Sequence, residues 1–152
     1  NISFSTNKNI DYKTNFNGLV TNWGDTDISF SPNLISSIAF NYNPKKDLNI
    51  SILNKFVGDQ YMSNTESVVS KLNSYSTTDL NFIYSFQKSK YFNEIIFTAM
   101  LNNIFNKEYV SNGYYYTYDD TWSDPNIVTT IEGTGYYPQA KRNFLIGFIF
   151  KL

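Results

Sequence analysis

The chain has 152 residues, enough for one domain, and 18% of them are aromatic although the mean hydropathy is −0.36. The net charge is −1 and no basic cluster dominates, so we do not expect nucleic acid as a partner. Histidine and cysteine are absent, which excludes an imidazole base, a Ser-His-Asp triad, a disulfide and a Cys- or His-ligated metal in this segment. We expect no catalytic residue, no metal and no cofactor.

The chain contains no run of about 18 apolar residues, so no transmembrane helix is predicted. It begins at Asn1 without a signal peptide, and we expect further sequence upstream. Short runs with period-2 alternation predict β-strands with one apolar face. In chain order the runs are 2–5, 37–42, 48–53, 79–86, 95–102 and 143–152.

The apolar parity of these runs is predicted to face lipid, because half of the residues in a transmembrane β-strand can be polar. The last run is the clearest, since every second residue from Phe144 to Leu152 is apolar. Asn54 and Asn103 break the pattern, and we expect a bulge or the end of the apolar zone at each. The lipid-facing residues predicted with most weight are Phe40, Phe82, Tyr84, Phe97 and Phe148.

The connections between the runs alternate in length. Two are short turns, at 43–47 and 87–93, whereas 13–33, 59–74 and 105–141 are long and polar. This alternation is typical of outer-membrane barrels, which have short periplasmic turns and long extracellular loops. The sequence thus predicts an all-β, antiparallel transmembrane β-barrel segment of about six strands in three hairpins, with its C-terminus on the periplasmic side. No helix is predicted beyond a short helical turn within 63–72.

Four segments resemble the C-terminal part of TonB-dependent outer-membrane receptors, especially those of Bacteroidetes type. The segment 56–62 (FVGDQYM), with Asn64, is similar to a "YVGxxYxxN" strand end, and 101–109 (LNNIFNKEY) is similar to "NNLFNKxY". The segment 136–147 (YYPQAKRNFLIG) resembles "YYPQAxxNFLxG". The last three residues (FKL) resemble an "LKF" terminus but end in Leu152, where Phe is usual.

The resemblance implies that the whole chain is the C-terminal part of a 22-stranded barrel in the bacterial outer membrane. It implies active uptake of a nutrient, such as an iron-siderophore, cobalamin, an oligosaccharide or a peptide. The implied partners are lipid, the TonB complex through an N-terminal region, the barrel-assembly machinery, and a surface lipoprotein or larger membrane complex. The final strand resembles an assembly signal, to which we assign Phe144, Gly147, Phe148, Phe150 and Leu152.

The most unusual stretch is a tyrosine-rich segment in the third long connection. Asn112-Gly113 precedes it and predicts a tight turn. Aromatic side chains at an extracellular surface can stack on a ligand, or they can extend a hairpin and pack on neighbouring loops. The candidate ligand-binding residues are Tyr114, Tyr115, Tyr116, Tyr118 and Trp122.

Other clusters are interpreted as structural in the first instance. Residues 102–109 include asparagines that suit a strand end and aromatics that suit a membrane interface. Four acidic residues match no EF-hand spacing, so a solvated acidic loop is favoured over a Ca²⁺ site. These four are Asp119, Asp120, Asp124 and Glu132. Little weight goes to glycosidase pairs at Asp25 with Asp27, or at Asp59 with Glu66.

Two alternative functions remain open. A soluble all-β, lectin-like module would bury one face of the strands against a second sheet. An outer-membrane adhesin or enzyme would use the same barrel, although the absence of a nucleophile motif argues against an enzyme here.

Overall fold

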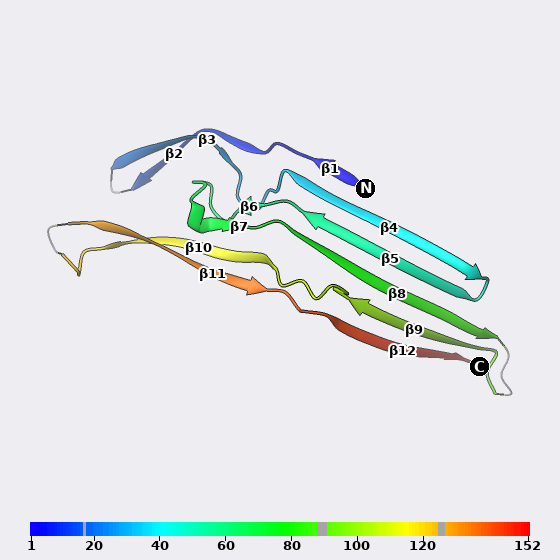
Figure 1. Cartoon of the computed structure of the whole chain (residues 1–152). Coiled ribbons are helices and arrows are strands. Elements are labelled where there is room, and N and C mark those ends of the chain that lie inside the picture. Colours follow the sequence, from blue (N-terminus) through cyan, green and yellow to red (C-terminus); the bar gives the residue numbers. More distant parts are fainter. Residues whose placement is uncertain (17, 88–90, 125–126) are drawn as a thin grey trace.

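The computed structural model describes residues 1–16, 18–87, 91–124 and 127–152, and the fold is all-β with antiparallel strands (Figure 1). The strands of the main sheet are β1 (Ile2–Phe4), β4 (Leu34–Lys45), β5 (Leu48–Val57), β8 (Tyr75–Gln87), β9 (Glu94–Asn102) and β12 (Asn143–Lys151). The remaining elements are β2 (Lys8–Phe16), β3 (Leu19–Asp27), β6 (Gln60–Tyr61), the 3-10 helix η1 (Val68–Ser70), β7 (Lys71–Leu72), β10 (Val110–Asp120) and β11 (Thr129–Pro138).

The main sheet has the order β1-β4-β5-β8-β9-β12. The pairs β2–β3, β6–β7 and β10–β11 form separate two-stranded sheets, and the six main strands pair in the order in which they follow along the chain. These six strands contain the six runs predicted from the alternation, except that Ser5 and Leu152 lie just outside β1 and β12. Within the described residues β1 and β12 pair on one side only, which leaves the sheet open. In the same part of the chain, no helix has the length and apolarity required to cross a membrane.

The register brings the predicted apolar parity of every strand onto one face of the sheet. One row across this face runs through Phe40, Ile52, Leu80, Leu101 and Phe144. The next rows run through Tyr42, Ile50, Phe82, Ala99 and Ile146, and then through Leu48, Tyr84, Phe97 and Phe148. All five predicted lipid-facing residues therefore share one face, as the alternation requires.

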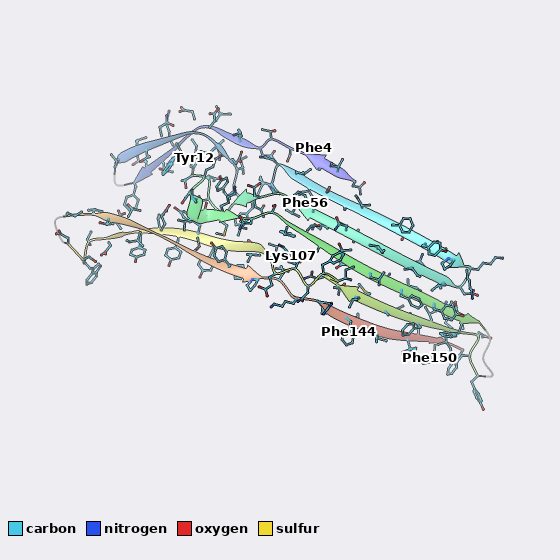
Figure 2. All side chains as sticks on the ribbon, viewed as in Figure 1. Phe4, Tyr12, Phe56, Lys107, Phe144 and Phe150 are labelled. Atoms are coloured by element: carbon cyan, nitrogen blue, oxygen red, sulfur yellow. The ribbon has the colours of Figure 1, made fainter. Side chains whose placement is uncertain are left out.

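This apolar face is a single exposed layer. Phe40 is 62% exposed and Phe148 is 57% exposed, while Phe82, Tyr84 and Phe97 are half-buried by neighbouring side chains. The half-buried rings pack edge to face or tilted, with centroids 5.9 Å apart for Phe82–Phe97 and 5.1 Å for Phe97–Phe148. Figure 2 labels Phe144 and Phe150 along β12, whose side chains stand clear of any second layer.

The opposite face is mixed and largely polar. Its rows include Asn41, Ser51 and Asn81, and also Ser37, Lys55 and Thr77. Apolar residues also occur on this face, on β5, β8, β9 and β12; they include Leu53, Ile83, Ile96, Met100, Leu145 and Ile149. The two faces thus differ clearly in polarity on β4, β5 and β8, and less on β9 and β12.

Asn54 marks the end of the apolar zone and does not form a bulge. The register is continuous from Leu53 to Lys55 on both sides of β5. The Asn54 side-chain amide donates to Thr78 Oγ1 on β8 at 2.9 Å. In the row of residues next to that of Ile52, β5 and β8 are therefore joined by a polar side-chain contact. Of the two expectations for this position, the bulge is wrong.

Two of the three long connections are largely β-hairpins, so the expectation of loops there is wrong in part. Strands β2 and β3 pair across most of 8–27, and β10 pairs with β11 over ten residue pairs. The 59–74 connection holds the short pair β6–β7 and η1, which agrees with the predicted helical turn. The turn at 43–47 is short, as expected, whereas part of 87–93 lies outside the described residues.

The hairpins lie at one end of the main sheet, and the C-terminus lies at the other end beside the short turns (Figure 1). Among the described residues, the buried hydrophobic side chains are Val57, Met62 and Leu72. All three belong to β5, β7 and the segment between them, at the base of the hairpins. Among the residues that the structure describes, no second layer covers either face of the main sheet, and Val57 is its only buried hydrophobic residue.

Candidate functional site

The candidate site is a tyrosine ladder on the hairpin β10–β11, defined as Tyr114, Tyr116, Tyr118 and Tyr137. The first three alternate along β10 and therefore point to one face. Ring centroids are 6.2 Å apart for Tyr114–Tyr116 and 6.4 Å for Tyr116–Tyr118, with interplanar angles of 24° and 17°. Tyr137, from β11, lies 6.1 Å from Tyr114. Each ring is about half exposed.

Two glycines on β11 allow the ladder to lie close to the sheet. Gly135 is paired with Tyr114, and Gly133 is paired with Tyr116. A Cβ at Gly133 would lie 2.4 Å from Tyr116 Cζ, and one at Gly135 would lie 2.2 Å from Tyr114 Cζ. The rings thus occupy the space that side chains on β11 would take, as aromatics do over cross-strand glycines. The pattern Tyr-x-Tyr facing Gly-x-Gly is the sequence signal that could have revealed the ladder.

Tyr115, which was predicted as a ligand-binding residue together with Tyr114, Tyr116 and Tyr118, does not belong to the ladder. It points to the opposite face, is half-buried, and donates from its hydroxyl to Glu132 Oε1 at 2.5 Å. Burial first, and then the Glu132 contact, raise the pKa of Tyr115. Hydrogen bonds from Tyr115 and Ser67 lower the pKa of the Glu132 carboxyl. The hydrogen-bonded group of Tyr115, Glu132 and Ser67 is called the latch below. Because Ser67 caps η1, the latch joins the hairpin β10–β11 to the 59–74 connection.

The base of the hairpin is tied down at Gly113. A Cβ there would lie 2.5 Å from the Gly135 carbonyl oxygen and 2.7 Å from Met62 Sδ. The predicted tight turn at Asn112-Gly113 is therefore wrong, because β10 continues through it with a register shift between Val110 and Asn112. Glycine is used here for close approach and not for turning.

Trp122 also lies apart from the ladder, beyond the end of β10, and is 92% exposed. Its backbone N–H donates to Asp120 Oδ1 at 2.9 Å, and Ser123 Oγ donates to Asp120 Oδ2 at 2.6 Å. The structure therefore unites three of the five predicted residues and separates Tyr115 and Trp122 from them.

Three of the four acidic residues have separate hydrogen-bond partners and do not converge on a common metal site. Asp119 accepts from Thr130 at 2.8 Å, Asp120 organises the turn above, and Glu132 forms the latch. No group of three potential ligands that could hold a metal ion occurs in the described part of the chain. A Ca²⁺ site at Asp119, Asp120, Asp124 and Glu132 is thus unsupported.

The two carboxylate pairs considered as glycosidase candidates also have structural partners. Asp25 accepts from the Asp11 N–H at 3.0 Å, and Asp27 lies 3.5 Å from Lys8 Nζ. Asp59 pairs with Lys71 at 2.6 Å. Glu66 accepts from the Asp27 N–H at 2.5 Å, which ties the segment after β6 to β3.

The 101–109 motif forms a turn at the end of β9 that is held by hydrogen bonds. Asn103 is 4% exposed, has φ of 51°, and its side chain both accepts from Lys107 N–H and donates to the Lys107 carbonyl at 2.8 Å. Its backbone N–H donates to Asp79 at 2.8 Å, while Asn106 accepts from the Arg142 N–H at 3.0 Å. These hydrogen bonds join β8, β9 and the chain that leads into β12, which confirms the structural interpretation of Asn103.

The 56–64 motif has a similar structural role at the end of β5. Gly58 donates to the Leu34 carbonyl at 2.8 Å, and a Cβ at Gly58 would lie 3.1 Å from that oxygen. Asn64 accepts from the Ser29 N–H at 2.7 Å. The motif therefore positions the start of β4 and the chain leaving β3.

A groove of about 450 Å³ lies between the start of β8 and the base of the hairpin β10–β11. Tyr75 stands beside it and stacks on Tyr109, which lines it, with centroids 4.4 Å apart. Lys107, another lining residue, lies at the junction of the hairpin and the main sheet (Figure 2). This groove was not predicted, because its lining residues come from three segments that are far apart in the sequence, at 71–74, 107–110 and 136–138.

The proposed assembly residues lie along β12, at the free edge of the main sheet. Phe144, Phe148 and Phe150 are exposed on the apolar face. Gly147 lies on the other face, where a Cβ would come within 2.9 Å of Thr98 Oγ1. Leu152 follows the strand and is 90% exposed.

No protein-family model, curated protein or solved structure matches this chain. The likeness to TonB-dependent receptors rests on the four motifs alone.

Proposed function

We propose that the main sheet is a sector of a transmembrane β-barrel in the bacterial outer membrane, within a TonB-dependent receptor that takes up a nutrient. The apolar face contacts lipid, the polar face lines the lumen, and the hairpins extend outside the cell. The C-terminus lies on the periplasmic side.

The observation that carries this proposal is the polarity difference between two exposed faces of one sheet. Burying an apolar face against water-excluding surroundings contributes about 25 cal/mol per Å². The described part of the chain supplies no second layer for that purpose. Lipid satisfies the apolar face, and closure into a barrel satisfies the free backbone groups of β1 and β12.

The dimensions of the sheet fit the same proposal. The main strands other than β1 have 9 to 13 residues, against about 9–11 for a tilted membrane strand. From Phe144 to Leu152 the chain rises about 27 Å at about 3.4 Å per residue. A tilt of about 40° reduces this to about 21 Å, close to the apolar band of about 25 Å in outer-membrane barrels.

A soluble lectin-like module is the competing proposal. It requires a second sheet to cover residues such as Phe40, Phe144 and Phe148, each more than half exposed. The hairpins cannot serve, because they lie beyond one end of the main sheet (Figure 1).

The membrane placement is testable with single cysteines, since the chain contains none. In outer membranes, a water-soluble maleimide should label Asn81→Cys and Thr98→Cys through the lumen. It should leave Phe82→Cys and Phe97→Cys unlabelled until detergent is added. Equal labelling of both parities in intact membranes would refute the barrel.

The transport role needs a separate measurement. Uptake of the receptor's nutrient by cells should cease when TonB is deleted and return when TonB is restored. Uptake that continues without TonB would leave the barrel proposal in place but remove the assignment to this receptor class.

A further inference from the structure

We infer that the tyrosine ladder is a stacking platform for an uncharged oligosaccharide. This inference rests on the proposed function and names the chemical class of the nutrient. It starts from how the hairpin is held, which determines the face that remains free.

Among the described residues, the contacts that join the hairpin β10–β11 to β7, η1 and the chain around them lie on one of its faces. On that face, the Tyr115 hydroxyl bonds Glu132 at 2.5 Å beside Ser67, and Gly113 packs against Met62. The ladder occupies the other face, and its rings are 49% to 55% exposed. The latch thus fixes the hairpin and presents the ladder outward.

The ladder face is flat as well as free. Because Gly133 and Gly135 bear no side chains, nothing on β11 rises between the rings of Tyr114 and Tyr116. The three rings on β10 are nearly parallel and evenly spaced along the strand. A flat, repeating aromatic surface suits a ligand built from repeating flat units.

The chemistry of this face selects the ligand class. Between Asn112 and Tyr118 on β10, and between Ile131 and Tyr137 on β11, the face carries no Asp, Glu, Lys or Arg. An anionic ligand would need Lys or Arg here, and a peptide would need pockets for its side chains. A sugar ring offers a C–H face to each tyrosine ring and hydroxyls to the phenol oxygens at the rim.

The test measures binding to the full-length receptor in detergent micelles by isothermal titration calorimetry. The probes are linear hexamers of glucose, mannose and xylose, with hexagalacturonate as a charged saccharide of matched length. At least one neutral hexamer should bind, and hexagalacturonate should bind more weakly than any neutral hexamer that does. Tyr116→Ala should lower the affinity about tenfold, the size expected when an aromatic binding residue is truncated.

Two further variants separate the ladder from general damage to the hairpin. Gly133→Val keeps every tyrosine but displaces the Tyr116 ring, so it should weaken binding as Tyr116→Ala does. Trp122→Ala removes an exposed aromatic outside the ladder and should leave the affinity unchanged.

The inference is overturned if no neutral hexamer binds, if hexagalacturonate binds more tightly, or if Trp122→Ala matters as much as Tyr116→Ala. In each of these cases the cysteine labelling pattern would still support the barrel. Failure of that pattern would instead remove the proposed function.

Discussion

Asn103 shows how one side chain can hold a strand end. It occupies the left-handed region at φ 51°, is nearly inaccessible to water, and satisfies two backbone groups of Lys107. Asparagine tolerates this conformation better than other residues with a Cβ, because its short side chain bonds nearby backbone. The same residue looked like a defect in the apolar alternation, since sequence parity carries no information on a turn held by hydrogen bonds.

We expect Asn103→Ala to reduce the free energy of unfolding by about 2–3 kcal/mol, from lost buried hydrogen bonds and a strained backbone. Asn103→Gly removes the bonds without the strain and should lose about 1 kcal/mol less. Urea unfolding of the full-length protein in lipid vesicles measures both. Asn102→Ala is the control, because its bond to Asn143 is exposed. An equal loss of unfolding free energy in the Asn102 and Asn103 variants would contradict this structural role of Asn103.

The Glu132 carboxylate gives the hairpin a pH dependence. Its folded pKa is lowered by the Tyr115 hydroxyl first and Ser67 second, so the charged form favours the latched hairpin. This stabilisation is present above the ordinary pKa of glutamate and is lost as pH falls through the lowered value. Burial raises the pKa of Tyr115, so the phenol remains a donor at neutral pH.

Hydrogen exchange of β10 and β11 should therefore accelerate as the pH falls below the ordinary pKa range of glutamate and through the lowered pKa of Glu132, after correction for the intrinsic rate. Tyr115→Phe should abolish most of this dependence while leaving the ladder in place. If the variant retains the wild-type pH profile, another group controls the hairpin.

At the scale of elements, the main strands were predictable and the hairpins were not. Period-2 alternation located all six strands of the main sheet and their faces, because one face is mainly apolar from the row of Phe40 to the row of Phe148. In β2 and β3 the alternation is interrupted, since Asp11 has φ of 51° and Gly24 has φ of 72° within a shifted register. The glycines of β11 can be interpreted only together with the tyrosines that they face, because the pairs Tyr114–Gly135 and Tyr116–Gly133 are formed by the register of the hairpin.

Strand β12 offers a test of the assembly signal. Its outer edge is unpaired in the described chain, and its apolar stripe supplies the register for pairing. Phe148→Asp or Phe150→Asp in the full-length protein should lower the amount of receptor at the cell surface. The affinity of the receptor that does assemble should stay unchanged. Ile149→Asp, on the opposite face, should assemble better than either.

Surface labelling combined with ligand binding distinguishes the outcomes for β12. Normal assembly with weakened ligand affinity would mean that this strand serves the binding site, and the assembly role would be lost.

For the whole molecule, the main sheet is one layer with two free edges and one apolar face. Such a sheet exposes backbone groups and hydrophobic surface together, which favours aggregation in water. We expect the segment 1–152 expressed alone to aggregate and to become ordered only within its barrel or a larger assembly. A monodisperse, protease-resistant monomer of 17.6 kDa in buffer without detergent would support the lectin-like module instead.

The most direct test of the central claim is a lysine placed on each face of the same strand. In the full-length protein folded into lipid vesicles, Phe82→Lys should cost about 2–4 kcal/mol, because a charge on the lipid face is expensive near the midplane. Asn81→Lys, one residue away on the opposite face, should cost much less, and Phe97→Lys with Thr98→Lys should repeat the contrast on β9. Equal costs on the two faces would show that the apolar face does not lie in lipid.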